Sequence, residues 1–143
     1  MPTSFTNNWK NILDKLENIF KAEFKGALKV YTGASVDAGN QYLRIDPIGS
    51  DLLEYSVGSE TREFSIDITY HFRDANVKIR ALDHILRYAS RIESLVHDNM
   101  SMTLSDNSNL FNCRMESCTL NQGDESEYIV VWDYKCMHMG NFN

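Results

Sequence analysis

A strand pattern followed directly by a helix pattern, between Thr61 and Asp98, constrains this fold more than any other part of the sequence. From Thr61 to Arg73 large apolar residues alternate with polar ones, which places the two kinds on opposite faces of a strand. From Asn76 to Asp98 apolar residues recur at helical spacing and form one stripe. The sequence therefore predicts a long half-buried strand, a short turn at residues 73–75, and a helix that folds back over the strand's apolar face.

The residues before this unit predict one helix and three shorter strands. Apolar residues from Phe5 to Phe24 lie close to one helical face, and Gly26 is a natural stop. A loop at 33–40 and turns at 46–49 and 58–60 are indicated by glycine, proline and small polar residues. The strands between these breaks are expected at Ala27–Thr32, Gln41–Ile45 and Leu52–Val57. With the central strand they make four consecutive strands, most simply an antiparallel meander.

The residues after the second helix predict a hairpin. Asn99 to Asn109 is polar and is expected to be an irregular loop, or a short strand around Met102. Leu110–Leu120 and Glu127–Met137 then form a long hairpin, and residues 140–143 a loose tail. The predicted fold class is α+β in a single domain, residues 1–143. About five to six strands form a largely antiparallel sheet against two amphipathic helices, in the order α-β-β-β-β-α-β-β.

Composition excludes several functional classes. Among 143 residues, 43% are hydrophobic and 24% charged, which is typical of a globular domain. The net charge of −6 disfavours a dedicated nucleic-acid binder, which usually carries a basic excess. There is no run of about 18 apolar residues that would cross a membrane, and the first residues lack the features of a signal peptide. Three cysteines, an odd number, are expected to be reduced thiols in a protein made in the cytoplasm.

Cysteine and histidine residues near the C-terminus are of the types that bind zinc. Cys113, Cys118, Cys136 and His138 follow the spacing C-x4-C-x17-C-x-H. In a regular hairpin Cys113 and Cys136 share one face, whereas Cys118 falls on the opposite face. Four such ligands do not converge on one tetrahedral centre, so we expect no metal. We also expect no cofactor.

Three polar residues of the central strand are candidates for a functional surface. Asp67, Thr69 and His71 share the strand's polar face, where they line either an acid–base site or a subunit contact. A polar strand face is more often plain solvent or a contact. The sequence holds no G-x-S-x-G, no H-E-x-x-H and no phosphate loop, so we expect no enzyme.

A row of basic residues on the second helix is a candidate docking surface. Arg80, His84, Arg87 and Arg91 are spaced by four, three and four residues, which stacks them along one helix face. Arginine favours pairing with carboxylate or phosphate, so an acidic patch on a neighbouring subunit is one possible partner. The alternative is a solvated helix face, on which Asp83 can form an ion pair with Arg87 four residues later.

Two loops are candidates for contact with partner proteins. The first is the loop at 33–40, and the second is the polar segment 99–109, whose apolar residues have no periodic frame of their own. The candidate contact residues are Ser35, Asp37, Asn40, Met100, Met102 and Leu104.

The order of elements resembles the tail-terminator (tail-completion) proteins of tailed bacteriophages, and more broadly the head–tail joining proteins. The resemblance is carried by the helix around Trp9–Leu13, the strand–helix unit from Arg62–Ile68 through Ile85 and Leu86, and the aromatic strand Tyr128–Tyr134. It spans nearly the whole chain as a pattern of elements, without a short diagnostic motif.

The resemblance implies a structural virion protein without catalytic residues. Members of this family form a hexameric ring that caps the finished tail tube and meets the head connector. It implies a protein of the tail or neck, assembled in the host cytoplasm. Its partners would be copies of itself, the tail tube protein and the connector or head-closure protein, with genomic DNA only as passing cargo and no membrane. An acidic surface would line a channel through which DNA passes without sticking.

Two other interpretations remain open from the sequence. One is another structural part of a phage tail, neck or baseplate with the same small-domain plan. The other is a small-ligand-binding or enzymatic α+β domain with a deep cavity, in which Asp67, His71 and Tyr134 would provide a polar lining.

Overall fold

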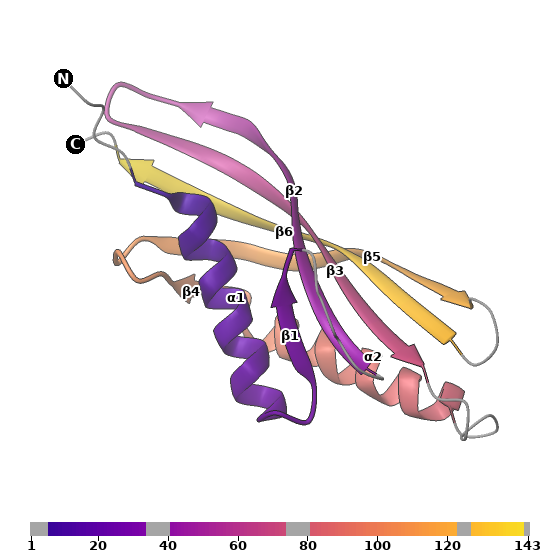
Figure 1. The fold of residues 1–143 in the computed structure, drawn as a ribbon. Coiled ribbons are helices and arrows are strands. Elements are labelled where there is room, and N and C mark those ends of the chain that lie inside the picture. Colours follow the sequence, from indigo (N-terminus) through magenta and orange to yellow (C-terminus); the bar gives the residue numbers. More distant parts are fainter. Residues whose placement is uncertain (1–5, 34–40, 74–80, 123–126, 142–143) are drawn as a thin grey trace.

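The computed structural model describes residues 6–33, 41–73, 81–122 and 127–141. In this part of the chain two helices accompany one six-stranded sheet with strand order β1-β2-β3-β6-β5-β4 (Figure 1). The elements are α1 (Asn8–Phe24), β1 (Lys29–Thr32), β2 (Gln41–Tyr55), β3 (Ser59–Arg73), α2 (Ala81–Asp98), β4 (Met102–Thr103), β5 (Asn109–Gln122) and β6 (Glu127–Asn141). The predicted α+β class, with a largely antiparallel sheet and two helices, is confirmed.

The alternating strand is the centre of the fold, as its pattern predicts. In β3 the residues from Phe64 to Phe72 at every second position are buried, and those between them are half-buried. β6 pairs with β3 in antiparallel register along its whole length, from Arg73 opposite Glu127 to Ser59 opposite Asn141. Trp132, which is fully buried, lies opposite Ile68 in this register. The two long strands therefore build the middle of the sheet and most of its apolar face.

Both helices cover the apolar face of the sheet. Helix α1 begins where the Asn7 side chain accepts a hydrogen bond from the Lys10 amide (3.0 Å), and it ends at Lys25, which adopts a left-handed conformation. A glycine with φ +88°, Gly26, then turns the chain towards β1. The core-facing residues of the helices, which join those of the sheet in one cluster, are Ile12, Leu16, Phe20, Phe24, Ile85, Ala89, Ile92 and Val96. The opposite face of the sheet, called the open face below, has no helix over it among the described residues.

The strands before α2 differ from the prediction in number and direction. The expected strands 41–45 and 52–57 form one strand, β2, and the expected turn at 46–49 is a register shift within it, between Pro47 and Gly49. A bulge allows proline inside a strand, because the missing N–H is not needed there. The expected meander is also wrong at β1, which pairs with β2 in parallel. The order of elements is thus α-β-β-β-α-β-β-β.

Several element boundaries also need correction. The hairpin connection lies at residues 56–58, because Ser59 and Glu60 already belong to β3. Helix α1 begins at Asn8 rather than Phe5. The short strand expected around Met102 is present as β4, and the expected loose tail is wrong at Gly140 and Asn141, which belong to β6. The predicted turn at 73–75 begins one residue early, because Arg73 still belongs to β3. Residues 74–75 and most of the loop at 33–40 lie outside the described residues.

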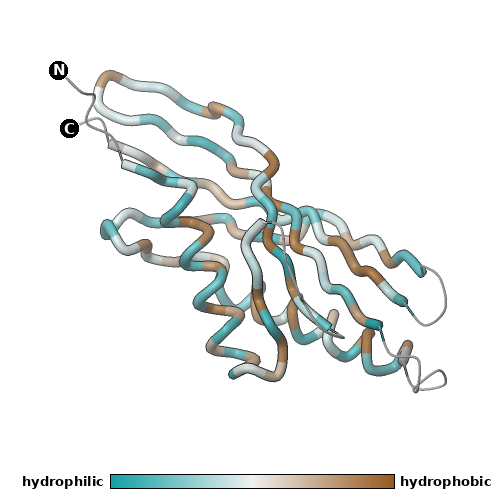
Figure 2. The backbone as a smooth tube through the Cα atoms, in the orientation of Figure 1, coloured by the Kyte–Doolittle hydropathy of each residue, from teal (hydrophilic) through white to brown (hydrophobic). Residues whose placement is uncertain are grey.

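The β2–β3 hairpin continues as an arm beyond the helix-covered core. The arm comprises residues 48–63, and the end of β6 pairs with its β3 strand (Figure 1). Its exposed large hydrophobic residues are Ile48 (61% exposed), Leu52 (49%), Leu53 (49%), Tyr55 (69%) and Val57 (102%). Figure 2 shows short brown, apolar stretches along the largely white and teal hairpin that the ends of β2 and β3 form. The arm therefore presents apolar side chains to solvent far from the core.

Candidate functional site

The open face brings three aspartates into one row across neighbouring strands. Asp67 of β3 lies opposite Asp46 of β2 on one side and opposite Asp133 of β6 on the other. Burial raises the pKa of Asp67 above its ordinary value, and the charges of Asp133 and Asp46 raise it further. Like charges placed directly opposite in a sheet are destabilising. We call Asp46, Asp67 and Asp133 the acidic row.

The other two predicted residues of this face lie beside the acidic row. Thr69 and His71 are half-buried on β3. The His71 ring stacks on Tyr42 (centroid distance 4.8 Å), and its Nε2 lies 3.1 Å from a Glu127 carboxylate oxygen. Its Nδ1 is buried without a hydrogen-bond partner among the described residues. The stacking on Tyr42 and the pair with Glu127 hold the His71 ring in one orientation on the open face.

The predicted basic row on α2 is largely occupied within the chain. Arg91 donates to the Glu23 carboxylate (2.8 Å) and to the Glu23 backbone oxygen (3.0 Å), and it lies over the Phe24 ring. His84 is 3.3 Å from the Gln41 side-chain oxygen and its ring contacts two aromatic rings. Arg87 forms a solvent-exposed pair with Asp83 on the same helix (3.1 Å). Only Arg87 among these three has a largely exposed charge, and Arg80 lies outside the described residues.

The predicted contact loops separate into buried, exposed and undescribed residues. Met102 (6% exposed) and Leu104 (3%) belong to the chain's own core, whereas Met100 is 54% exposed. Ser35, Asp37 and Asn40 of the first loop lie outside the described residues. Two of the apolar residues of segment 99–109 thus pack in the core although their spacing shows no regular period, because β4 pairs with β5.

The cysteines are not arranged as the regular hairpin predicts. Cys113 and Cys136 are buried, and a hydrogen bond between their thiols lowers the pKa of Cys113 and raises that of Cys136. Cys118 points to the helix side of the sheet and not to the opposite face, because register shifts in β5 change the alternation. The expected placement of Cys118 is therefore wrong. Among the described residues no group of three or more metal-ligating side chains gathers at one point.

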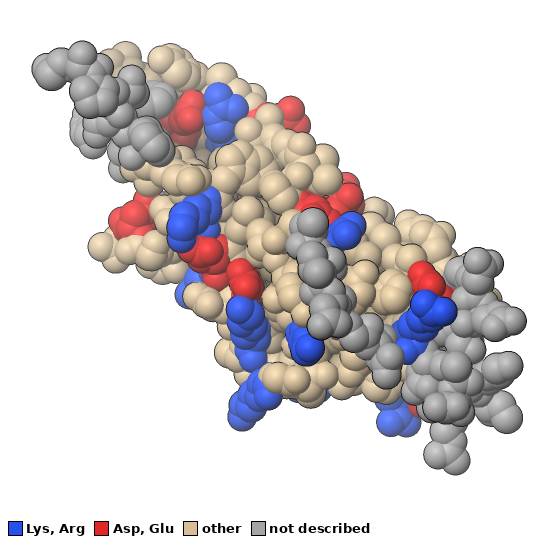
Figure 3. Space-filling view, in the orientation of Figure 1, with Lys and Arg blue, Asp and Glu red and all other residues tan. Residues whose placement is uncertain are grey.

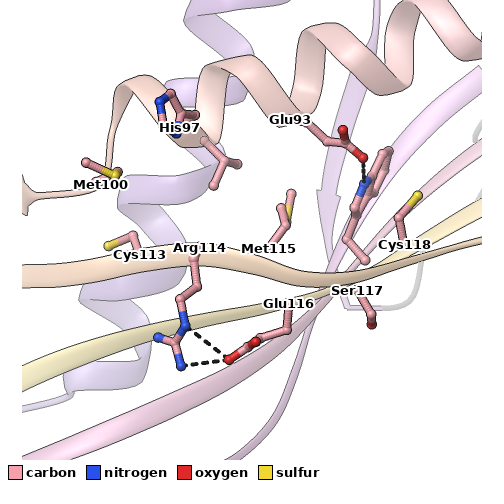
Figure 4. Close-up of a pocket in the computed structure, with 11 residues that line it drawn as sticks. Glu93, His97, Met100, Cys113, Arg114, Met115, Glu116, Ser117 and Cys118 are labelled. Atoms are coloured by element: carbon pink, nitrogen blue, oxygen red, sulfur yellow. Dashed lines mark hydrogen bonds and ion pairs between the residues drawn. The ribbon is translucent and has the colours of Figure 1, made fainter.

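A groove between α2 and β5 is a feature that the sequence analysis missed. It has a volume of about 390 Å³. Its apolar lining residues are Val96, Met100, Cys113, Met115, Cys118 and Trp132, and its polar ones are Glu93, His97, Arg114, Glu116 and Ser117. Figure 4 shows Met115 and Cys118 pointing from β5 towards α2, with His97 above them and Ser117 turned away. Glu93 accepts a hydrogen bond from the Trp132 indole nitrogen (2.9 Å) at one end. The groove therefore combines a sulfur-rich apolar part with polar residues around it, and the thioethers suit an adaptable contact surface.

The exposed surface of α1 carries both positive and negative side chains. Lys10 pairs with Asp14 (2.6 Å) and Lys21 with Glu17 (2.7 Å), both one helical turn apart. Figure 3 shows blue and red side chains next to one another on this face of the molecule. Such exposed ion pairs contribute little to stability, and their exposure indicates that this face of α1 lies in solvent. No helix among the described residues is both long and apolar enough to cross a bilayer.

Comparisons with known proteins show a shared fold. No family model matches the chain. No curated protein matches it either. One solved structure, of a protein whose name states no function, has a TM-score of 0.66 and 13% identity, covering 96% of this chain and 99% of that chain. Another, a chain in the virion of a native gene transfer agent (GTA) particle, has a TM-score of 0.61 and 11% identity, covering 92% of this chain and 93% of that chain. At these identities the likeness shows the fold.

Proposed function

We propose that this chain is a structural protein of a tailed-phage-like particle and, more narrowly, a tail terminator. In this role copies of the chain form a ring, hexameric in the family it resembles, that caps the tail tube and joins it to the head connector. The protein performs no catalysis and resides in the tail or neck of the virion, after assembly in the host cytoplasm. The observation that carries the proposal is the whole-length likeness to a chain of a GTA virion.

The open face supports the proposal through its charge. The acidic row places three carboxylates side by side at a cost to the fold, and a DNA channel gives them a use. Like charge between the channel wall and the phosphate backbone keeps DNA from sticking as it passes. In a ring whose open faces line the channel, each subunit adds one acidic row, and together these rows form an acidic belt around the DNA.

The surfaces available to partners follow from the exposed residues. Arg87 keeps a largely exposed guanidinium, so it is the described member of the basic row best placed to meet an acidic neighbour. Met100 is the exposed apolar residue of segment 99–109. We assign the tail tube protein and the connector to the loops that contain Ser35, Asp37, Asn40 and Met100. Thr69 and His71 lie beside the acidic row and face the channel with it.

The test is assembly with tails. Purified protein is measured by light scattering over a concentration series, then mixed with tail tubes that lack a terminator and imaged by electron microscopy. A ring-sized species, or rings on one end of each tube, is the expected result. Failure both to form rings in solution and to bind tube ends, at every concentration, overturns the terminator role. Binding along the tube wall, or at the baseplate end, would instead identify another structural tail component.

One observation favours a second candidate function, that of a small-ligand-binding domain. The groove of about 390 Å³ between α2 and β5 lies in the size range of small-molecule sites, although it is open along one side. A ligand screen followed by thermal shift tests this function. A compound that raises the melting temperature of the wild type, but not of Met115→Trp, supports it.

A further inference from the structure

We infer that the arm of one copy of this chain lies along β5 and in the groove of the next copy. The inference rests on the proposed ring and names the surfaces that close it. One copy presents the arm at one edge of its sheet, and its neighbour receives it at the opposite edge. Contacts between two different surfaces of identical chains close into a ring when the rotation allows.

The receiving edge is the outer edge of β5. β4 covers only its start, where Met102 and Thr103 pair with Leu110 and Asn109, and a backbone bond from Cys113 to Met100 follows. Beyond that point no described strand lies on this side of β5. Sheet edges in native proteins are usually guarded by charges, proline or short length. Residues 117–122 (Ser-Cys-Thr-Leu-Asn-Gln) carry no charge and no proline, so this edge is open to strand addition.

The groove extends the receiving surface beside that edge. A strand added to β5 points every second side chain towards α2, into the space lined by Met115, Cys118 and Trp132. These side chains are apolar, and the thioether adapts to the shape of what it meets. Leu120, further along β5, is 44% exposed and continues the apolar surface. The occupant must therefore be an extended segment with apolar side chains on one face.

The arm has these properties. Its β2 strand pairs with β1 only up to Ile45, so the outer edge beyond this residue has no strand partner among the described residues. The shift between Pro47 and Gly49 marks where the strand leaves the body, since bulges bend the strand that carries them. Leu52 lies opposite Arg62, which shares the helix side of the sheet with Phe64. Leu52 is thus on the side of the sheet where the groove lies.

Charge selects this contact over symmetrical ones. The described residues give no ion-pair partner to Asp51 or Glu54, so two arms paired with each other would oppose like charges. Two β5 edges paired with each other would leave the apolar arm in water. Pairing the acidic arm with the neutral stretch 117–122 avoids both costs, because that stretch carries no charge and the neighbouring Glu116 is already paired with Arg114 (2.8 Å). A second copy of the chain therefore supplies a β5 edge for the arm and an arm for the β5 edge.

The first test is a cross-link to the native Cys118. Leu52→Cys places a thiol on the groove side of the arm, and diamide as oxidant removes the two electrons and two protons as the disulfide forms. We expect a ladder of covalent oligomers on a non-reducing gel. Two matched controls should give none: Leu52→Cys with Cys118→Ser, and Asp51→Cys, whose position faces the open side. Equal cross-linking by Asp51→Cys and Leu52→Cys, or none by either, overturns the contact.

The second test uses two variants that each destroy one surface. Leu52→Asp with Leu53→Asp adds charge to the arm, and Leu120→Lys guards the β5 edge. These side chains are about half exposed, so both variants should keep the wild-type circular dichroism. Each alone is expected to be monomeric, and an equal mixture should give a dimer and nothing larger. If both variants still form rings, the ring stands and this contact is wrong. If the wild type forms no ring and Leu52→Cys gives no ladder, both proposals fail together.

Discussion

Removing one charge from the acidic row should stabilise the subunit. Asp67 lies opposite both Asp46 and Asp133, and a like-charged pair directly opposite in a sheet costs about 0.2–1 kcal/mol. With two such pairs, Asp67→Asn is expected to raise the free energy of unfolding by about 1 kcal/mol. For a domain of this size that corresponds to roughly 3 °C in melting temperature. Arg44 pairs with Asp46 (2.7 Å) and partly offsets the repulsion, so the gain should not exceed about 2 kcal/mol.

The sign of the pH dependence distinguishes charge repulsion from other causes. The pKa of Asp67 is raised in the folded state, so the folded chain holds this proton to higher pH than the unfolded chain. Wild-type stability therefore falls as pH rises from the ordinary value of 3.8 through the raised folded pKa. Above that window the variant keeps its full advantage, and towards pH 3.8 and below it loses the advantage.

Urea unfolding at several pH values and salt concentrations measures this effect. The advantage of Asp67→Asn should shrink in high salt, because screening weakens the repulsion in the wild type. Asp98→Asn, at an exposed position at the end of α2, is the matched control for loss of one negative charge. An advantage that is the same at every pH and salt concentration, or a loss of stability at neutral pH, would refute the reasoning. In the proposed ring, the stabilised variant is also expected to retain DNA more strongly.

Three further predictions follow from the described contacts. Arg91→Ala should lower the free energy of unfolding by about 1–2 kcal/mol, because it removes an ion pair with Glu23 and a cation–π contact with Phe24. Arg87→Ala should change it by less than about 0.5 kcal/mol, because its pair with Asp83 is exposed; chemical denaturation compares the two variants. A thiol reagent should label Cys118 in the native monomer, and all 3 cysteines only in denaturant, and the proposed ring should protect Cys118; mass spectrometry counts the labels. Burial lowers the pKa of His138, so stability should fall as pH drops below its ordinary 6.5 through the folded value, and His138→Gln should flatten this slope in thermal melts.

The local patterns of the sequence predict the elements well, but not their partners. Alternation in β3 and the stripe in α2 follow from the side chains alone, because burial on one face leaves a period in the sequence. The parallel pairing of β1 with β2 leaves no such trace, since direction depends on the path of the chain in space. The acidic row is likewise invisible before the register is known, because its members come from three separate strands.

Two errors of the sequence analysis have the same physical origin. Pro47 and Gly49 indicate a turn by composition, yet the chain absorbs them as an irregularity in β2. The shift between Met115 and Ser117 likewise turns Cys118 towards α2, which a strict period of two does not allow. One extra residue in a strand changes the face of every later residue, so the groove and its cysteine follow from an irregularity that no periodic template contains.

The position of β6 in the sheet has a consequence for the order of events during synthesis. The middle of the sheet is completed by β6, whose neighbour β3 lies far back in the chain, so that Ser59 is opposite Asn141. Until residues 127–141 leave the ribosome, β3 and β5 have no shared neighbour and the core cannot close. Contacts between residues so distant in sequence form slowly and late. A nascent subunit therefore has neither a finished arm nor a finished β5 edge, and the proposed assembly requires chains whose translation has passed this strand.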